Sequence, residues 1–392
     1  MHMDPFMPEL VGSIVAILLA GLLMHELRQP NVIAYLIAGI MLGPSLFGAI
    51  TDQQVLDRLG QFGVVMLMFF IGMEVSPEKV IARWRVALLG TFMQIVVSVA
   101  LTTAIGHFFD WPFVLCVLLG FIISLSSTAV VLNLLQARKE LETRHGQNAL
   151  NVLLAQDIAV IPMLIVVSIL SGEKVSRMEM TMQVIGGILL IACCAWIVIR
   201  PGFRIPLIGD AVKKDHELQV FGAMLLCFGL ALLTGLFSLS SALGSFVAGI
   251  VVAAAKEAKW VHHSLEPFKT VFVALFFVSV GMLVDIDFVL HHWGKVLSLA
   301  LIALTVNMAI NATVFKILGE TWGDSLYTGA ILAQIGEFSF VLAAVGASSM
   351  IISKENYQLA VAVIVVSLLL SPLLISRMRR YALGGDELHK EP

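Results

Sequence analysis

The sequence contains few charged residues, few cysteines and no long polar stretch. Only 13% of its 392 residues are Asp, Glu, Lys or Arg, whereas a soluble domain usually carries about 25%. This scarcity leaves no room for a separate soluble domain, and a net charge of −3 gives no reason to expect nucleic acid as a partner. The four cysteines all fall in apolar segments, where we expect small core residues and neither disulfides nor metal ligands: Cys116, Cys193, Cys194 and Cys227.

Apolar runs of around 20 residues recur along the chain, which is 59% hydrophobic, and runs of this length indicate transmembrane helices. We therefore predict an all-α integral membrane protein with about thirteen transmembrane helices. The first run does not read as a cleaved signal peptide, because its leading end is acidic at Asp4 and Glu9 and lacks Lys and Arg. The expected spans are residues 9–27, 31–50, 56–73, 84–108, 112–136, 147–171, 179–200, 216–237, 240–257, 267–285, 293–318, 325–348 and 357–379.

Lys and Arg are divided unequally between the two sets of loops. If the N-terminus faces outside, most of the 24 Lys and Arg residues fall on the cytoplasmic side, which is the usual bias of membrane proteins. The sequence therefore predicts an external tail at residues 1–8, a membrane domain at 9–380 and a cytoplasmic tail at 381–392.

Three short motifs of the first half recur in the second half at offsets of 209 or 210 residues. A period of this length contains seven helices, an odd number, so related helices run in opposite directions. We predict two inverted six-helix repeats, at residues 9–171 and 216–379, joined by a linker helix at 179–200, which is a plan found in secondary transporters. The motifs are Ala38-Gly39-Ile40 with Ala248-Gly249-Ile250, Gly72-Met73 with Gly281-Met282, and the segments that begin at Gly120 and Gly329.

Polar and small residues interrupt two spans near the middle of the membrane. Ser124 to Thr128 interrupt the fifth span, and Gly336-Glu337 interrupt the twelfth at a related position. Hydroxyl side chains can satisfy the backbone groups that an unwound turn leaves free. We predict a pair of crossed broken helices whose half-helix ends face an ion; the alternative is two continuous helices with small residues at packing faces.

Asp157 lies about ten residues inside the sixth span, roughly 15 Å deep at a rise of 1.5 Å per residue. No Lys or Arg lies within a turn of it on the same helix. A carboxylate in such a place does not stay bare, so it binds a proton or a metal cation. If the two compete for one site, the protein exchanges them. The alternative is a carboxyl group that stays protonated and hydrogen-bonded in the core.

Several segments between residues 10 and 380 resemble the cation/proton antiporter-2 superfamily, and most closely its Kef-type potassium/proton members. Sodium/proton relatives commonly carry Asp-Asp or Asn-Asp where this chain has Gln156-Asp157, so the resemblance implies potassium. It also implies a homodimer with an elevator-like core, in the inner membrane of a bacterium. The segments are Tyr35-Leu36-Ile37-Ala38-Gly39, Gly43-Pro44, Leu125-Ser126-Ser127-Thr128-Ala129, Gln156-Asp157-Ile158-Ala159 with Pro162, Glu266-Pro267-Phe268-Lys269, Phe276-Phe277, Gly281-Met282, and Gln334 with Gly336-Glu337-Phe338.

The chain departs from the Kef pattern in three ways. Kef-type proteins usually continue into a cytoplasmic nucleotide-binding regulatory domain, whereas this sequence stops at Pro392, shortly after the last span. The resemblance therefore implies a separate regulatory nucleotide-binding domain or subunit as a partner. The acidic regulatory loop is altered at residues 259–266, which argues against glutathione control. Asn307 stands where many relatives place a lysine. Without that positive charge near Asp157, one-for-one electroneutral exchange is the simpler hypothesis.

We interpret the sequence as that of a potassium/proton antiporter, with sodium as the next cation, no cofactor and no enzymatic activity. Asp157 is the shared carboxylate, and Gln156 supplies a neutral oxygen to the metal ion. Ser127 and Thr128 are further candidate ligands, while the supporting residues are Ser126, Glu337, Gln334 and Asn307. The alternatives are a proton-coupled symporter of a small organic solute and a passive potassium channel, although nothing matches a carbonyl-lined filter motif.

Overall fold

The structure, a computed structural model, consists of helices in its described part, which confirms the all-α prediction. It describes residues 31–44, 53–74, 85–170, 216–237, 241–254 and 258–382, together with positions 15, 19, 46, 48, 178, 181–182, 185–190, 192 and 239. The predicted spans 9–27 and 179–200 lie outside the described residues except for these isolated positions. The same holds for the external tail and for most of the C-terminal tail.

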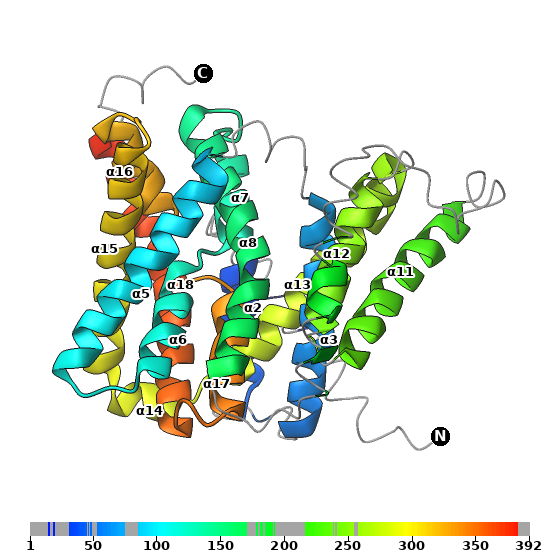
Figure 1. Ribbon diagram of the computed structural model, residues 1–392, viewed down its shortest axis with the longest axis horizontal. Coiled ribbons are helices and arrows are strands. Elements are labelled where there is room, and N and C mark those ends of the chain that lie inside the picture. The colour runs from blue at the N-terminus through cyan, green and yellow to red at the C-terminus, as the bar shows by residue number, and fades with distance from the viewer. Residues whose placement is uncertain are drawn as a thin grey trace. The chain divides into compact units, whose positions relative to one another are not determined.

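The chain divides into two compact units, each described here by itself. The first unit contains α2, the helices between residues 83 and 173, and the helices that follow residue 281 (Figure 1). Its elements are α2 (Asn31–Leu42), the π-helix η1 (Arg85–Gly90), α5 (Thr91–Phe108), α6 (Phe113–Ser124), α7 (Thr128–Ala137), α8 (Arg144–Leu170), α14 (Ile286–His291), α15 (Trp293–Ile317), α16 (Trp322–Ile331), α17 (Phe338–Ser348) and α18 (Lys354–Ala382).

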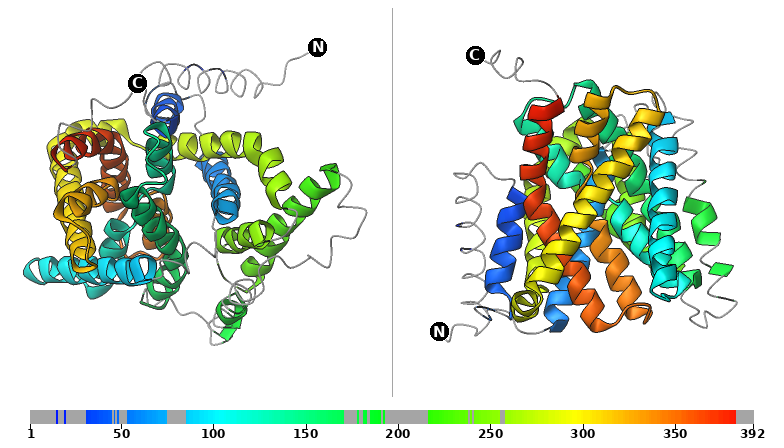
Figure 2. Two further views of the ribbon diagram at one scale, coloured as in Figure 1. Left: turned by 90° about the horizontal axis from the view of Figure 1, so that it is seen from above. Right: turned by 90° about the vertical axis from the view of Figure 1, so that its left-hand side faces the viewer.

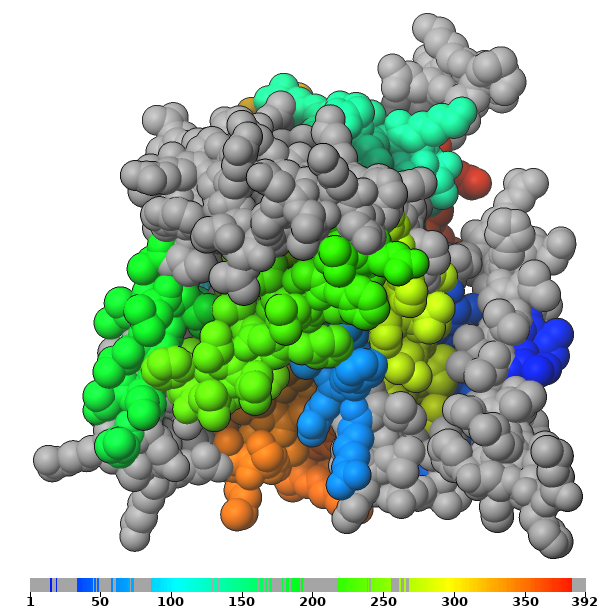
Figure 3. Space-filling model, turned by 90° about the vertical axis from the view of Figure 1, so that its right-hand side faces the viewer, coloured from blue at the N-terminus to red at the C-terminus, as the bar shows by residue number. Residues whose placement is uncertain are grey.

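The second unit contains four described helices. In it α12 packs against both α3 and α11, and these helices lie on the face shown in Figure 3. Its core is formed by apolar side chains of α3, α11, α12 and α13, including the buried free thiol of Cys227. Cys116 of the first unit is also a buried free thiol, so these two cysteines lie in the core as predicted. The helices are α3 (Gln53–Glu74), α11 (His216–Leu236), α12 (Ser241–Ala254) and α13 (Ala258–Met282), whose last two residues belong to the first unit.

Helices occupy each predicted span that lies in the described residues, with three differences in detail. Helix α2 ends at Leu42 and not at residue 50, because Gly43 and Pro44 follow it. Helix α13 begins at Ala258, before the predicted start at residue 267, because the helix continues beyond the apolar stretch. The short helix α14 was not predicted, and it begins where the Asp285 carboxylate accepts a hydrogen bond from the Phe288 N–H at 3.0 Å. The described helices long and apolar enough to cross a membrane alone are at Val86–Phe108, Glu217–Leu236, Trp293–Ile317 and Lys354–Ala382.

Two spans of the first unit are broken where the sequence predicts it. The fifth span divides into α6 and α7, with extended backbone at Leu125 and Ser127. The twelfth divides into α16 and α17, separated by residues 332–337. Figure 1 shows α6 and α17 at one end of this unit and α7 and α16 at the other, so the broken helices run in opposite directions.

Glycines of the repeated motifs make closely matching backbone contacts. A Cβ atom on Gly72 would lie 3.0 Å from the Gly249 Cα, and one on Gly281 would lie 2.9 Å from the Gly39 Cα. In each contact a glycine of a Gly-Met motif meets a glycine of an Ala-Gly-Ile motif, and both partners lie within one unit. In a third pair, a Cβ on Gly120 would lie 2.6 Å from the Val99 Cα, and one on Gly329 would lie 2.7 Å from the Met308 carbonyl oxygen.

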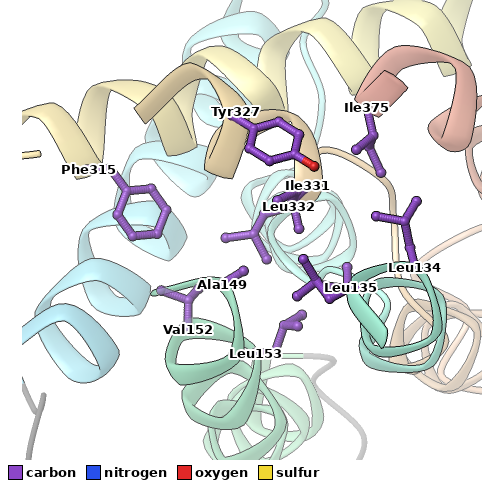
Figure 4. Packing of buried hydrophobic residues seen from close by; sticks show 11 residues of the cluster. Leu134, Leu135, Ala149, Val152, Leu153, Phe315, Tyr327, Ile331, Leu332 and Ile375 are labelled. Atoms are coloured by element: carbon purple, nitrogen blue, oxygen red, sulfur yellow. The ribbon is translucent and has the colours of Figure 1, made fainter. Parts of the chain in front are cut away.

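The first unit has an apolar core beside the broken helices. Side chains from α7, α8, α15, α16 and α18 converge on it (Figure 4), and the ribbons of α15, α16 and α18 lie together in both views of Figure 2. This packing fixes the half-helix α7 against α8, the helix that carries Asp157. The core residues are Val131, Leu134, Leu135, Ala149, Val152, Leu153, Phe315, Tyr327, Ile331, Leu332 and Ile375.

The turn between α7 and α8 holds a buried carboxylate, Glu140. Its oxygens accept hydrogen bonds from Arg379 Nε and from the Tyr327 hydroxyl, both at 2.6 Å, and His145 Nε2 lies 3.7 Å away. Burial alone would raise the pKa of Glu140, but His145, Tyr327 and Arg379 together lower this pKa to about 2. The ion pair ties the turn before α8 to the end of α18.

We expect Glu140→Gln to destabilise the protein most above pH 4.5. The pKa of Glu140 is lowered from 4.5 to about 2, so its stabilisation is complete above the unfolded-state pKa and is lost as the pH falls through the folded-state pKa. By linkage the full effect is of the order of 3 kcal/mol. Thermal unfolding in detergent should show a difference between wild type and Glu140→Gln that is full at pH 7 and shrinks between pH 4.5 and 2.

The exposed Glu142 in the same turn provides the control. Glu142→Gln should unfold like the wild type at every pH. A deficit for Glu140→Gln that is the same at pH 7 and at pH 2.5 would contradict the assigned ionic role.

Candidate functional site

Asp157 lies on α8, next to the start of the half-helix α7. Its side chain is buried, with 4% of the residue exposed. The Thr128 hydroxyl, on the first residue of α7, lies 3.3 and 3.2 Å from the two carboxylate oxygens and donates to them. A broken helix thus brings a hydroxyl donor and the positive end of its peptide dipoles to a buried carboxylate.

Side chains satisfy the last carbonyl groups of α6, which have no partners within the helix. The Phe121 carbonyl accepts from Ser124 Oγ at 2.9 Å, and the Ile122 carbonyl accepts from Ser339 Oγ at 2.7 Å. Asn307 Nδ2 donates to the next carbonyl, that of Ile123. Each donor is a buried side chain, as an unwound turn without water requires.

Two glutamine side chains donate hydrogen bonds to the last carbonyl of α6. Gln94 Nε2 and Gln156 Nε2 each lie 3.0 Å from the Ser124 carbonyl oxygen. Gln156 Nε2 also donates to Gln94 Oε1 at 2.7 Å, and Gln156 Oε1 accepts from the Ser126 N–H at 3.0 Å. Both ends of the Gln156 amide are therefore engaged in holding the break, on the residue that precedes Asp157.

The two breaks contact each other directly. The Gly336 N–H donates to the Leu125 carbonyl at 2.8 Å, and Ser126 Oγ donates to the Leu332 carbonyl at 2.7 Å. Gln334 Nε2 lies 3.4 Å from the Ser127 carbonyl oxygen. The structure thus brings the supporting residues Ser126 and Gln334 together at one crossing.

Asn307, from α15, joins both broken helices through a single amide nitrogen. Besides Ile123 it donates to the Ala333 carbonyl at 3.2 Å. Its Oδ1 is buried and has no hydrogen-bond partner in the described part of the chain. Glu337 is also buried, immediately before the first residue of α17. Ser127 is buried at the start of α7, where its hydroxyl accepts from the Val130 N–H at 3.3 Å.

Gln94 is a site residue that the sequence analysis did not identify. The buried polar residues of α5 are Thr91, Gln94, Ser98 and Thr102, spaced three or four apart on an otherwise apolar helix. This spacing places them on one helical face. A polar stripe within an apolar run is the signal that could have identified Gln94.

The oxygen atoms available to bind a cation at this site are those of one carboxylate and several neutral groups. Within the described ranges, no three His, Cys, Asp or Glu side chains gather as they would in a transition-metal site. A charged oxygen beside hydroxyl and amide oxygens suits a cation that exchanges water for protein oxygens. The arrangement can therefore hold either a proton or a small cation at Asp157.

Comparison with known proteins agrees with this chemistry. The family model described as "Sodium/hydrogen exchanger, transmembrane" matches residues 14–379. The iron transporter MagA of Paramagnetospirillum magneticum is 36% identical over 377 residues, which cover 95% of this chain and 86% of that protein. The glutathione-regulated potassium-efflux system protein of Haemophilus influenzae is 31% identical over 97% of this chain, and K(+) efflux antiporter 5 of Arabidopsis thaliana is 30% identical over 93%.

The chain spans 63% and 65% of the length of these two potassium-efflux relatives. Among solved structures, the sodium proton antiporter MjNhaP1 from Methanocaldococcus jannaschii matches with a TM-score of 0.66 and 16% identity, covering 96% of this chain and 98% of that chain. This likeness shows a shared fold. From the family match and these relatives, the chain belongs to the sodium/hydrogen exchanger family of membrane cation/proton antiporters, in the Kef-type branch of the cation/proton antiporter-2 superfamily.

Proposed function

We propose that the protein exchanges potassium for protons by competition at Asp157, with sodium as the next candidate cation. The observation that carries this proposal is the buried carboxylate beside Thr128, next to two crossed helix breaks. Only one of the two positive ions can occupy the carboxylate at a time. If the core moves between the two membrane faces when the carboxylate is occupied, one ion crosses for the other.

The matching glycine crossings support two inverted repeats, which are the basis of an alternating-access movement. The uncharged Asn307 supports electroneutral exchange, because its amide serves the helix breaks and adds no fixed positive charge. The names of the potassium-efflux relatives support potassium as the cation. The proposal includes an elevator-like homodimer in a bacterial inner membrane, with the N-terminus outside and the C-terminus in the cytoplasm.

Proton flux in proteoliposomes tests this function. Liposomes with an internal pH-sensitive dye should show proton movement when potassium is added outside, with weaker responses to sodium, lithium and rubidium. Ferrous iron belongs in the panel because the Paramagnetospirillum relative is named an iron transporter. Proton flux that ignores every cation but follows an organic solute would favour a symporter. Potassium flux with no proton movement would favour a channel.

If exchange is electroneutral, a voltage imposed across the liposome membrane should not drive it. Clear voltage dependence would contradict the electroneutral part of the proposal and leave the exchange itself intact.

A further inference from the structure

The neutral oxygens at the end of α6 are already bound to donors. Side chains donate to the carbonyl groups of Phe121, Ile122, Ile123 and Ser124, and the Leu125 carbonyl accepts from the Gly336 N–H. The amide oxygen of Gln156 accepts from the Ser126 N–H. These groups hold the break together, so using them as cation ligands would cost hydrogen bonds.

Gln334, unlike these groups, has an amide oxygen that accepts no hydrogen bond in the described part of the chain. Its side chain is fully buried, and its Nε2 points to the carbonyl of Ser127, the residue just before Thr128. Its Oε1 is buried without a hydrogen-bond partner among the described residues. The Ser127 carbonyl also accepts from the Val131 N–H at 3.2 Å, and because a carbonyl oxygen can only accept, the end of the Gln334 amide that faces it is the nitrogen. An amide oxygen without a donor in the described structure therefore belongs to the side chain that contacts Ser127, the residue before Thr128.

A buried acceptor without a donor destabilises the folded protein, and such groups require an explanation. A cation that has shed water takes oxygen ligands of this kind. The Asn307 oxygen is also without a donor in the described structure, but the bonds of its amide lead to Ile123 and Ala333. The bond of Gln334 leads to the segment that contacts Asp157.

We propose that Gln334 Oε1 is the neutral oxygen that binds the transported cation beside Asp157, and that Gln156 is a positioning residue that holds the break. This inference rests on the proposed cation/proton exchange. The cation then has ligands from both broken helices, Thr128 of α7 and Gln334 of the α16–α17 break. The loss of Gln334 Oε1 should affect cation binding and leave the proton-carrying carboxylate in place.

Three variants of buried glutamines test the assignment: Gln334→Met, Gln156→Met and Gln94→Met. Each replaces an amide by an apolar group of similar length. Gln334→Met should raise the apparent KM for potassium about tenfold or more and change the potassium/sodium preference, while the maximal rate stays within about threefold. It should also lose the thermal stabilisation that potassium gives the wild type. The other two should lower thermal stability and maximal rate and keep the wild-type KM.

Gln334→Glu provides a second measurement should Gln334→Met fail to fold. It keeps an oxygen at this position and adds negative charge, so its KM for potassium should fall. Unchanged KM in both Gln334 variants, or in Gln334→Glu alone if the other does not fold, overturns the assignment, as does a raised KM in Gln156→Met alone. Failure of the exchange function itself would look different, because the wild type would then show no cation-driven proton flux.

Discussion

Asp157→Asn should abolish cation-driven proton flux, with a loss of at least about 100-fold. The exchange requires one group that binds a proton and a cation in turn, and a neutral amide does not take up a proton and brings no negative charge to hold a cation in its place. The substitution keeps the shape of the side chain, so its contact with the Thr128 hydroxyl can persist. The measurement is the initial rate of internal pH change in proteoliposomes after a potassium pulse, with wild type and variant reconstituted at equal density.

Two control variants show whether the loss of proton flux comes from removing the carboxylate at Asp157. Asp157→Glu keeps a carboxylate and should retain part of the flux with a changed cation preference. Glu142→Gln removes an exposed carboxylate outside the site and should leave the flux unchanged. A folded Asp157→Asn protein that still exchanges potassium for protons would remove Asp157 from the mechanism.

Gly336→Val should both inactivate and destabilise the protein. Even a Cβ atom at Gly336 would lie 2.5 Å from the Ser126 carbonyl carbon and 2.9 Å from the Ser127 nitrogen. These are backbone atoms of the other break, so relief requires separation of the two broken helices. Overpacking of this kind typically costs about 1–3 kcal/mol, and the separation would also break the bond from the Gly336 N–H to Leu125. Thermal unfolding and potassium-driven flux measure the two effects.

Gly294→Ala is the matched control, because a Cβ there meets nothing within 4 Å. Alanine is the better helix former, so this control should be as stable as the wild type or more so. If Gly336→Val unfolded at the wild-type temperature and transported normally, the two breaks would not be in contact as described.

The sequence allowed the helices and the two breaks to be predicted, because both depend on local composition. Continuous apolar runs mark the spans, and Ser126, Ser127 and Gly336 mark the points where backbone groups need other partners. The start of α13 was misplaced because that helix continues into polar sequence. Helix α14 was missed because it is too short to carry a periodic pattern.

The hydrogen-bond partners within the site could not be predicted in the same way. A buried glutamine among apolar neighbours can donate or accept, and its partners lie far away in the sequence. Gln156 accepts from Ser126, 30 residues away, and Gln334 donates to Ser127, 207 residues away. The sequence therefore predicted the burial of Asp157 and its neighbour Thr128. Which groups the side-chain amides of Gln156 and Gln334 donate to or accept from depends on how the two helix breaks pack together.

The hydrogen bond from the Gly336 N–H to the Leu125 carbonyl spans the crossing of the two breaks. Deep in the protein, this amide proton can be replaced by deuterium only when the bond opens and solvent enters. Its rate of isotope exchange therefore records how often the two broken helices part. If the crossing stays closed throughout the transport cycle, deuterium uptake at Gly336 should not accelerate during turnover.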